Sequence, residues 1–153
     1  MGRIIMSLTI FALAVSACST LAQSPLPTAD VPELGQTWIL KMNHSGGIMG
    51  LSRSIEISSD GNYTVTDERT NSRLEGKLSA AELVKLSDLL ATAISNPPPG
   101  GRNSACADCF IYTIEFKGAG TSFTAEVDDT TIAESGLEPL VNFVRGIMEK
   151  DLR

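Results

Sequence analysis

Apolar and polar residues alternate along two early segments of the chain, residues 38–43 and residues 51–58. In the first segment Trp38, Leu40 and Met42 occupy every second position. Alternation with a period of two predicts a β-strand that buries one face. The glycine-rich residues 44–50 lie between the segments, so we expect the two strands to pair as an antiparallel hairpin.

Further segments show the same strand pattern. Asp60, Gly61 and Asn62 predict a tight turn, after which residues 63–67 and 73–78 form the third and fourth strands. The fourth is short and polar, which predicts a position at the edge of the sheet. Residues 110–117 and 121–127 form a second hairpin that is rich in aromatic residues, so we expect it to lie near the centre of the core.

Two segments carry the three-to-four-residue apolar spacing of amphipathic helices. Residues 80–95 follow Ser79, which can form a capping box with Glu82. The second helix begins near Leu137, with Pro139 in its first turn, and runs to Met148. The order ββββ-α-ββ-α with short joins predicts an α+β fold, in which a single antiparallel sheet is covered on one face by two helices.

The first residues of the chain predict export. Arg3 precedes an apolar run, residues 4–15, that is too short to span a bilayer comfortably. The following Val15-Ser16-Ala17-Cys18 resembles the bacterial lipobox, which implies cleavage before Cys18 and lipidation of that residue. We therefore expect a lipoprotein signal peptide at 1–17, a Pro-containing tether at 18–36 and one folded domain at 37–153.

The predicted location is the cell envelope, with Cys18 anchored in the membrane by its lipid. Ser19 follows the Cys, which in a cell with two membranes resembles the signal for the outer membrane facing the periplasm. Cleavage after Ala22 is the alternative, and it would release a soluble periplasmic or secreted protein. The net charge of −6 is spread along the chain without a basic run, so we expect no nucleic-acid partner.

Few residues of the chain suggest catalysis. His44 is followed by Ser45, but neighbours on a strand point to opposite faces, so we expect a solvated residue at the edge of the loop. Cys106 and Cys109 have the C-x-x-C spacing, yet they precede a strand rather than the helix N-terminus that activates redox thiols. In an oxidising compartment this pair predicts a small structural disulfide.

Acidic residues also cluster near the second hairpin. Asp128 and Asp129, with Thr130 and Thr131, predict a solvated loop that caps the last helix rather than a calcium or acid–base site. We therefore expect no catalytic residue, no metal ligand and no cofactor.

The glycine-rich connection is the candidate partner-binding site. It presents Ile48 and Met49 where polar turn residues are usual, among glycines that permit unusual backbone angles. The predicted contact residues are Ser45, Gly46, Gly47, Ile48, Met49, Gly50 and Arg53. A plain connector that folds back to bury Ile48 and Met49 is the alternative.

The run Ser45-Gly46-Gly47-Ile48-Met49-Gly50-Leu51-Ser52-Arg53 resembles the N-terminal signature of emfourin-like proteins. The leucine-rich helix, the strand at Phe110 and the closing strand and helix also lie where that family has its own, so the similarity covers about residues 39–147. Emfourin is a protein inhibitor of thermolysin-like (M4) zinc metallopeptidases. The resemblance implies an envelope-anchored inhibitor or sequestering partner of such a peptidase. The C-x-x-C, the export signal and the region 63–78 depart from the family pattern.

We therefore expect a binding protein and not an enzyme. An envelope lipoprotein with a structural or assembly role, bound to other envelope proteins and without a peptidase target, is the second hypothesis. A thiol oxidoreductase that uses Cys106 and Cys109 is the third.

Overall fold

The computed structural model describes residues 37–97, 101–102, 105–118 and 120–152. The predicted signal peptide, Cys18 and the tether lie outside the described residues. None of the helices in the described part is long and apolar enough to cross a bilayer.

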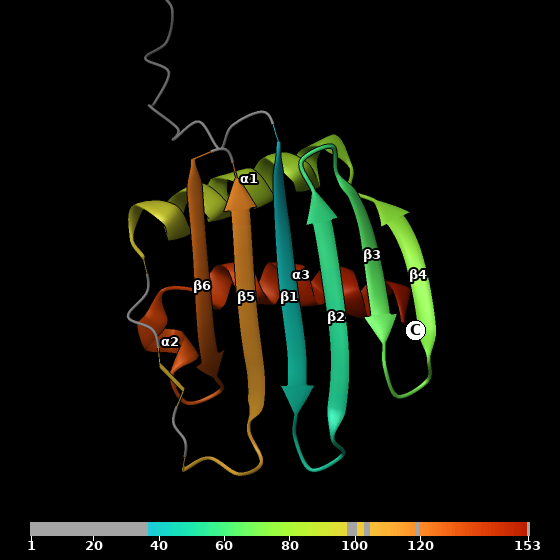
Figure 1. The fold of residues 1–153 in the computed structure, drawn as a ribbon, viewed down its shortest axis with the longest axis vertical. Coiled ribbons are helices and arrows are strands. Elements are labelled where there is room, and N and C mark those ends of the chain that lie inside the picture. The colour runs from blue at the N-terminus through green and yellow to red at the C-terminus, as the bar shows by residue number, and fades with distance from the viewer. Residues whose placement is uncertain (1–36, 98–100, 103–104, 119, 153) are drawn as a thin grey trace, which may run out of the picture.

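The described residues form a six-stranded antiparallel sheet with the strand order β4-β3-β2-β1-β5-β6 (Figure 1). Strands β1 to β4 are joined by consecutive hairpins, and so are β5 and β6. Helix α1 lies between β4 and β5 in the chain, and β5 then pairs with β1. The predicted edge position of the polar fourth strand is confirmed. The strands are β1 (Trp38–Gly46), β2 (Leu51–Ser58), β3 (Asn62–Asp67), β4 (Ser72–Lys77), β5 (Phe110–Gly118) and β6 (Thr121–Asp128).

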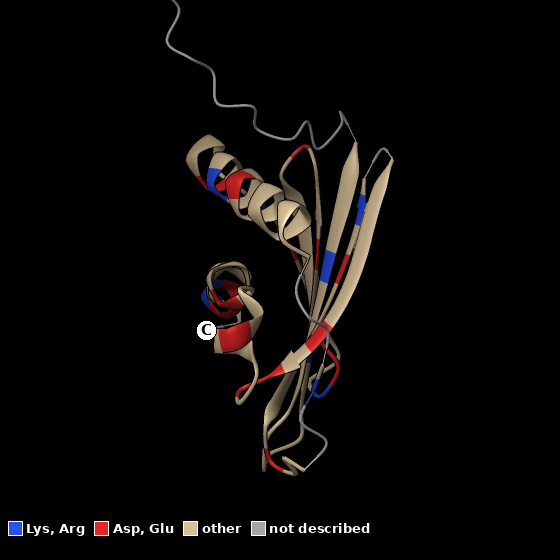
Figure 2. Cartoon of the chain, turned by 90° about the vertical axis from the view of Figure 1, so that its left-hand side faces the viewer, with Lys and Arg blue, Asp and Glu red and all other residues tan. Residues whose placement is uncertain are grey.

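The helices α1 (Ala80–Ser95) and α3 (Glu138–Asp151) cover one face of the sheet, which confirms the predicted α+β architecture (Figure 2). The capping box at the start of α1 is present. The Ser79 amide donates to Glu82 Oε2 at 2.8 Å, and the Glu82 amide donates to Ser79 Oγ at 3.3 Å. Two of the first-turn amides therefore have partners, as the sequence predicts.

The core lies between this face of the sheet and the two helices. Alternate residues of β1 and β5 point into it, and Leu40, Met42, Ile114 and Phe116 are each 1% exposed. Leu86 and Leu90 of α1 and Val141, Val144 and Met148 of α3 complete the layer. The opposite face carries the polar members of the alternation, which is the usual arrangement of an antiparallel sheet with one solvated side.

The structure differs from the sequence predictions at two connections. First, β1 runs on through Ser45 to Gly46, because both residues pair with β2 on one side and with β5 on the other. Second, the short helix α2 (Ile132–Ser135), which the sequence patterns did not predict, follows β6.

The prediction of a solvated loop is confirmed for Asp129 and Thr130, which are exposed, but it is wrong for Asp128. Asp128 has no exposed surface, and its Oδ1 accepts hydrogen bonds from the amides of Thr130 at 2.8 Å and Thr131 at 3.1 Å. The carboxylate thus organises the turn after β6 by supplying a local acceptor for backbone donors.

Candidate functional site

The connection between β1 and β2 consists of residues 47–50 and projects from the end of the sheet (Figure 1). Ile48 is 88% exposed and Met49 is 74% exposed. The alternative in which the loop folds back to bury these two side chains is therefore wrong. A pair of adjacent, almost fully exposed apolar side chains at the tip of a hairpin is available for contact with another molecule.

Glycines determine the path of this loop. Gly46, Gly47 and Gly50 have φ values of +97°, +69° and +58°, which side chains strongly disfavour. The amide of Gly50 donates to the Gly47 carbonyl at 2.9 Å and closes the turn. A Cβ atom at Gly46 would collide with the backbone carbonyl of Cys109, so only glycine fits there without a shift of the strands.

The turn that precedes β5 supports the base of the loop. The sulfur atoms of Cys106 and Cys109 lie at disulfide distance, with their Cα atoms 5.6 Å apart. The Gly47 amide donates to the Cys109 carbonyl at 3.2 Å, and the Phe110 ring lies directly against the backbone of Gly47. The two connections are thus joined at the same end of the sheet (Figure 1). The cysteine pair is brought together beside the candidate loop, not at a helix N-terminus.

The seven predicted contact residues are not all in the loop. Ser45 and Gly46 belong to β1, opposite Ser52 and Leu51 of β2. Only the residues at positions 47–50 form the connection itself, so the part of the predicted site that projects into solvent is smaller than expected.

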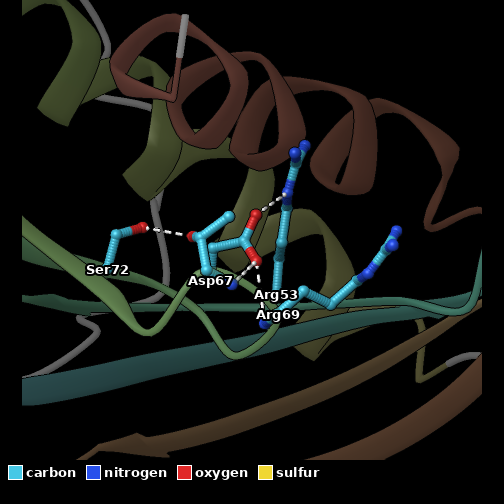
Figure 3. A network of polar contacts seen from close by, with 5 residues as sticks. Arg53, Asp67, Arg69 and Ser72 are labelled. Carbon is cyan, nitrogen blue, oxygen red and sulfur yellow. Dashed lines mark hydrogen bonds and ion pairs between the residues drawn. The ribbon is translucent and has the colours of Figure 1, made fainter.

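Arg53 lies on β2 and pairs with a neighbouring strand instead of extending to the loop tip (Figure 3). Its Nε donates to Asp67 Oδ2 at 2.8 Å, and the Asp67 side chain also accepts from the amides of Arg69 and Thr70. Asp67 is only 5% exposed, and the hydrogen bond from Arg53 is the main reason that its pKa is lowered. Arg53 therefore has a structural role at this end of the sheet.

His44 is buried, and the prediction of a solvated residue at the loop edge is wrong. It is 5% exposed because the extended β1 places it between Arg53 of β2 and Tyr112 of β5. Its ring stacks on Tyr112 with centroids 4.8 Å apart and meets the Phe110 ring edge-on at 5.0 Å.

The environment of His44 favours the neutral imidazole. Burial lowers its pKa, and the Arg145 guanidinium lowers it further. Neither ring nitrogen has a hydrogen-bond partner among the described residues. The imidazole therefore acts as an aromatic packing element, and both of its ring nitrogens, the atoms that a general base would use, are buried.

Polar contacts tie the strand beside the loop to the C-terminal half of the chain. The Tyr112 hydroxyl donates to Asp129 Oδ1 at 3.2 Å and accepts from Arg145 of α3 at the same distance. Asp129 Oδ2 also accepts from the Phe110 amide at 2.9 Å. These residues stabilise the start of β5. Sequence reasoning singled out Asp129 but could not assign it a partner, because the partners lie 17 and 19 residues away.

The described residues offer no metal centre, since no group of three or more His, Cys, Asp or Glu among them is arranged to hold an ion. Arg53 and Arg145 are each paired with an acidic residue, Asp67 and Glu149 respectively. These two arginines behind the loop are therefore compensated within the fold.

A scan against protein-family models finds no match to this chain, and a search of curated proteins finds none either. The resemblance to emfourin-like proteins therefore rests on the residues quoted above, and the activity that it implies belongs to the proposal that follows.

Proposed function

We propose that this protein is an exported, lipid-anchored binding protein whose residues 47–50 contact a partner protein. The observation that carries the proposal is the exposure of Ile48 and Met49 side by side at the loop tip. Single exposed apolar residues are common on protein surfaces, but two adjacent exposed apolar residues on a projecting loop with a hydrogen-bonded base are typical of contact sites.

The glycine geometry supports a preformed contact surface. The Gly47 amide donates a hydrogen bond to the Cys109 carbonyl, and the Gly50 amide donates one to the Gly47 carbonyl. The loop backbone therefore has a defined conformation before a partner binds. A loop that is already ordered loses less conformational entropy on binding, which favours affinity. The projecting shape suits a partner with a concave site.

The resemblance to emfourin-like proteins supports a thermolysin-like zinc metallopeptidase as that partner, and inhibition as the outcome. The run from Ser45 to Arg53 carries the similarity, and it includes the loop tip. An enzyme active-site cleft is a concave surface of the kind that Ile48 and Met49 could enter.

Strand β1 runs from the end of the sheet where the predicted tether joins the domain to the end that carries the loop. The strand begins at Trp38 and reaches the loop after nine residues, at the opposite end of the sheet (Figure 1). At roughly 3.3 Å per residue, the loop tip lies about 30 Å from the point where the tether would join the domain. A tether that joins the domain before Trp38 would therefore attach at the end of the sheet opposite the loop.

The proposal is tested by titrating thermolysin with the full-length chain in mild detergent and measuring peptide hydrolysis. We expect inhibition at micromolar protein or below, and we expect Met49→Asp to weaken it at least about tenfold, as a central interface residue would. Val84→Asp is the control, because Val84 is 62% exposed on α1, away from the loop. Absence of inhibition by the wild-type chain at micromolar concentration would refute the peptidase proposal.

A further inference from the structure

A groove lies between α1 and α3, which run side by side across one face of the sheet (Figure 2). Its volume is about 520 Å³. The apolar residues that line it include Leu89 of α1 and Phe143 and Ile147 of α3, and its cationic residues are Lys85 and Lys150, here called the groove lysines. The groove therefore offers an apolar strip together with two positive charges.

Gly146 of α3 also lines this groove. It lies within the helix and its φ is not positive, so no turn requires a glycine there. A Cβ atom at this position would meet no neighbouring atom within 4 Å, so packing among the described residues does not require glycine either. Glycine is less favourable than alanine inside a helix, but it lets another stretch of backbone approach closely. The missing side chain thus leaves room for an extended segment to lie against α3.

The positive charges of the groove are not neutralised within the described part of the fold. The Nζ atom of Lys85 lies 5.1 Å from the centroid of the Phe143 ring, and neither groove lysine forms a salt bridge with a described residue. Glu82, the acidic residue of the lining, is engaged in the capping box with Ser79. The chain as a whole carries a net charge of −6, so this groove has the chemistry to attract acidic segments with apolar side chains.

The chain itself contains such a segment at residues 26–34, Leu-Pro-Thr-Ala-Asp-Val-Pro-Glu-Leu, which lies outside the described residues. Its two prolines favour the polyproline II conformation, in which three residues complete one turn. Positions three apart then point the same way, so Val31 and Leu34 share one edge and Asp30 and Glu33 share another. An apolar edge beside an acidic edge complements an apolar strip beside two lysines, and proline-rich segments bind grooves with aromatic walls in this way.

The segment is long enough to reach the groove. It ends four positions before Trp38, and β1 begins at the end of the sheet that α1 crosses (Figure 1). Passing half-way around a helix of about 10 Å diameter takes about 16 Å. At about 3.1 Å per residue, positions four to twelve before Trp38 lie about 12–37 Å along the chain. Cleavage before Cys18 or after Ala22 leaves this segment in the mature protein.

We propose that residues 26–34 dock in the groove between α1 and α3 of the same chain, with their apolar edge on the lining and their two carboxylates facing the groove lysines. A docked segment leaves only residues 18–25 as a free link to the lipid, about 25 Å at 3.1 Å per residue. The groove therefore fixes how the domain is oriented at the membrane. This inference does not depend on the identity of any partner.

The test uses an endoproteinase that cleaves after glutamate, with the full-length chain in mild detergent and mass spectrometry of the product cut after Glu33. We expect Gly146→Trp to speed this cleavage about tenfold or more, because the indole occupies the groove and the released segment is open to the protease. Ala133→Trp is the control, since Ala133 is also a small exposed helical residue but lies on α2, outside the groove; it should change the rate by about twofold or less. Circular dichroism and urea unfolding establish that each variant is folded.

Replacing both groove lysines by glutamine should also speed the cleavage, by about threefold or more, because exposed ion pairs contribute weakly to stability. Rates within twofold of the wild type for both Gly146→Trp and the double lysine variant would overturn the inference.

A second measurement identifies the occupant directly. A photoreactive amino acid at position 31 should form an adduct within residues 82–89 or 139–150 of the same chain, in a yield that does not change on dilution and that is lost in Gly146→Trp. Adducts only outside these residues, or only between two copies of the chain, would overturn the inference and leave the proposed function standing.

Discussion

Gly46 is the residue whose replacement tests the structure of the loop base most sharply. Its φ is +97°, and a Cβ atom would collide with the carbonyl oxygen of Cys109. That oxygen belongs to the backbone, so it cannot turn aside as a side chain could. Gly50 is the matched control, because its φ is +58° but a Cβ atom there would have no neighbour within 4 Å.

The expected magnitudes follow from this difference. An alanine at either position takes on an unfavourable left-handed backbone, which costs about 1–2 kcal/mol. At Gly46 the collision must also be relieved by separating β1 from β5, and overpacking of this kind costs about 1–3 kcal/mol more. Gly46→Ala should therefore lower the free energy of unfolding by about 2–5 kcal/mol, and Gly50→Ala by about 1–2 kcal/mol.

Urea unfolding followed by circular dichroism measures both values. The slope of the free energy against urea concentration should be similar for the wild type and both variants if each unfolds in two states. If Gly46→Ala is no less stable than Gly50→Ala, then Gly46 does not lie against Cys109, and the argument that the two connections are joined is refuted.

Three further variants probe the residues around the loop. Burial lowers the pKa of His44, so the unfolded chain binds a proton on this residue more readily than the folded chain does. The contribution of neutral His44 to the free energy of unfolding should therefore be complete above about pH 6.5 and should be lost as the pH falls below that value. In urea unfolding at several pH values, His44→Phe should lose less stability than the wild type over this acidic range. Replacing both Cys106 and Cys109 by Ser should lower the free energy of unfolding by only about 2 kcal/mol or less, because the loop that the pair closes is short; a clearly larger loss in urea unfolding would contradict this. Arg53→Ala should destabilise the fold by about 1–3 kcal/mol, because buried Asp67 loses its charged donor. Arg53 lowers the pKa of Asp67, so this difference from the wild type should be present above about pH 3.9 and should disappear as the pH falls through the lowered pKa.

Local sequence patterns predicted most of the architecture. The capping box of Ser79 and Glu82 marked the start of α1, and alternation marked the strands, because these signals act within a few residues. The short joins then implied antiparallel pairing on a single sheet. The glycines around Ile48 and Met49 correctly indicated an exposed, projecting loop.

The environment of the loop could not be predicted in the same way, because it depends on strand register. His44 is buried because β5 places Phe110 and Tyr112 against its ring, and β5 begins 66 positions later in the chain. A glycine at position 46 also suggested the end of the strand, although pairing on both sides extends β1 through it. Tertiary pairing overrides local propensity at such positions.

Site-specific photo-crosslinking at position 49 in the producing cell is the most direct test of whether the loop is the contact surface. A photoreactive amino acid replaces Met49 in one strain and Val84 in another, because both side chains are strongly exposed but only Met49 lies at the loop tip. The account predicts an adduct with a thermolysin-like metallopeptidase from position 49 and none from position 84. Equal adducts from both positions, or no peptidase adduct from position 49 in cells that produce the enzyme, would contradict it.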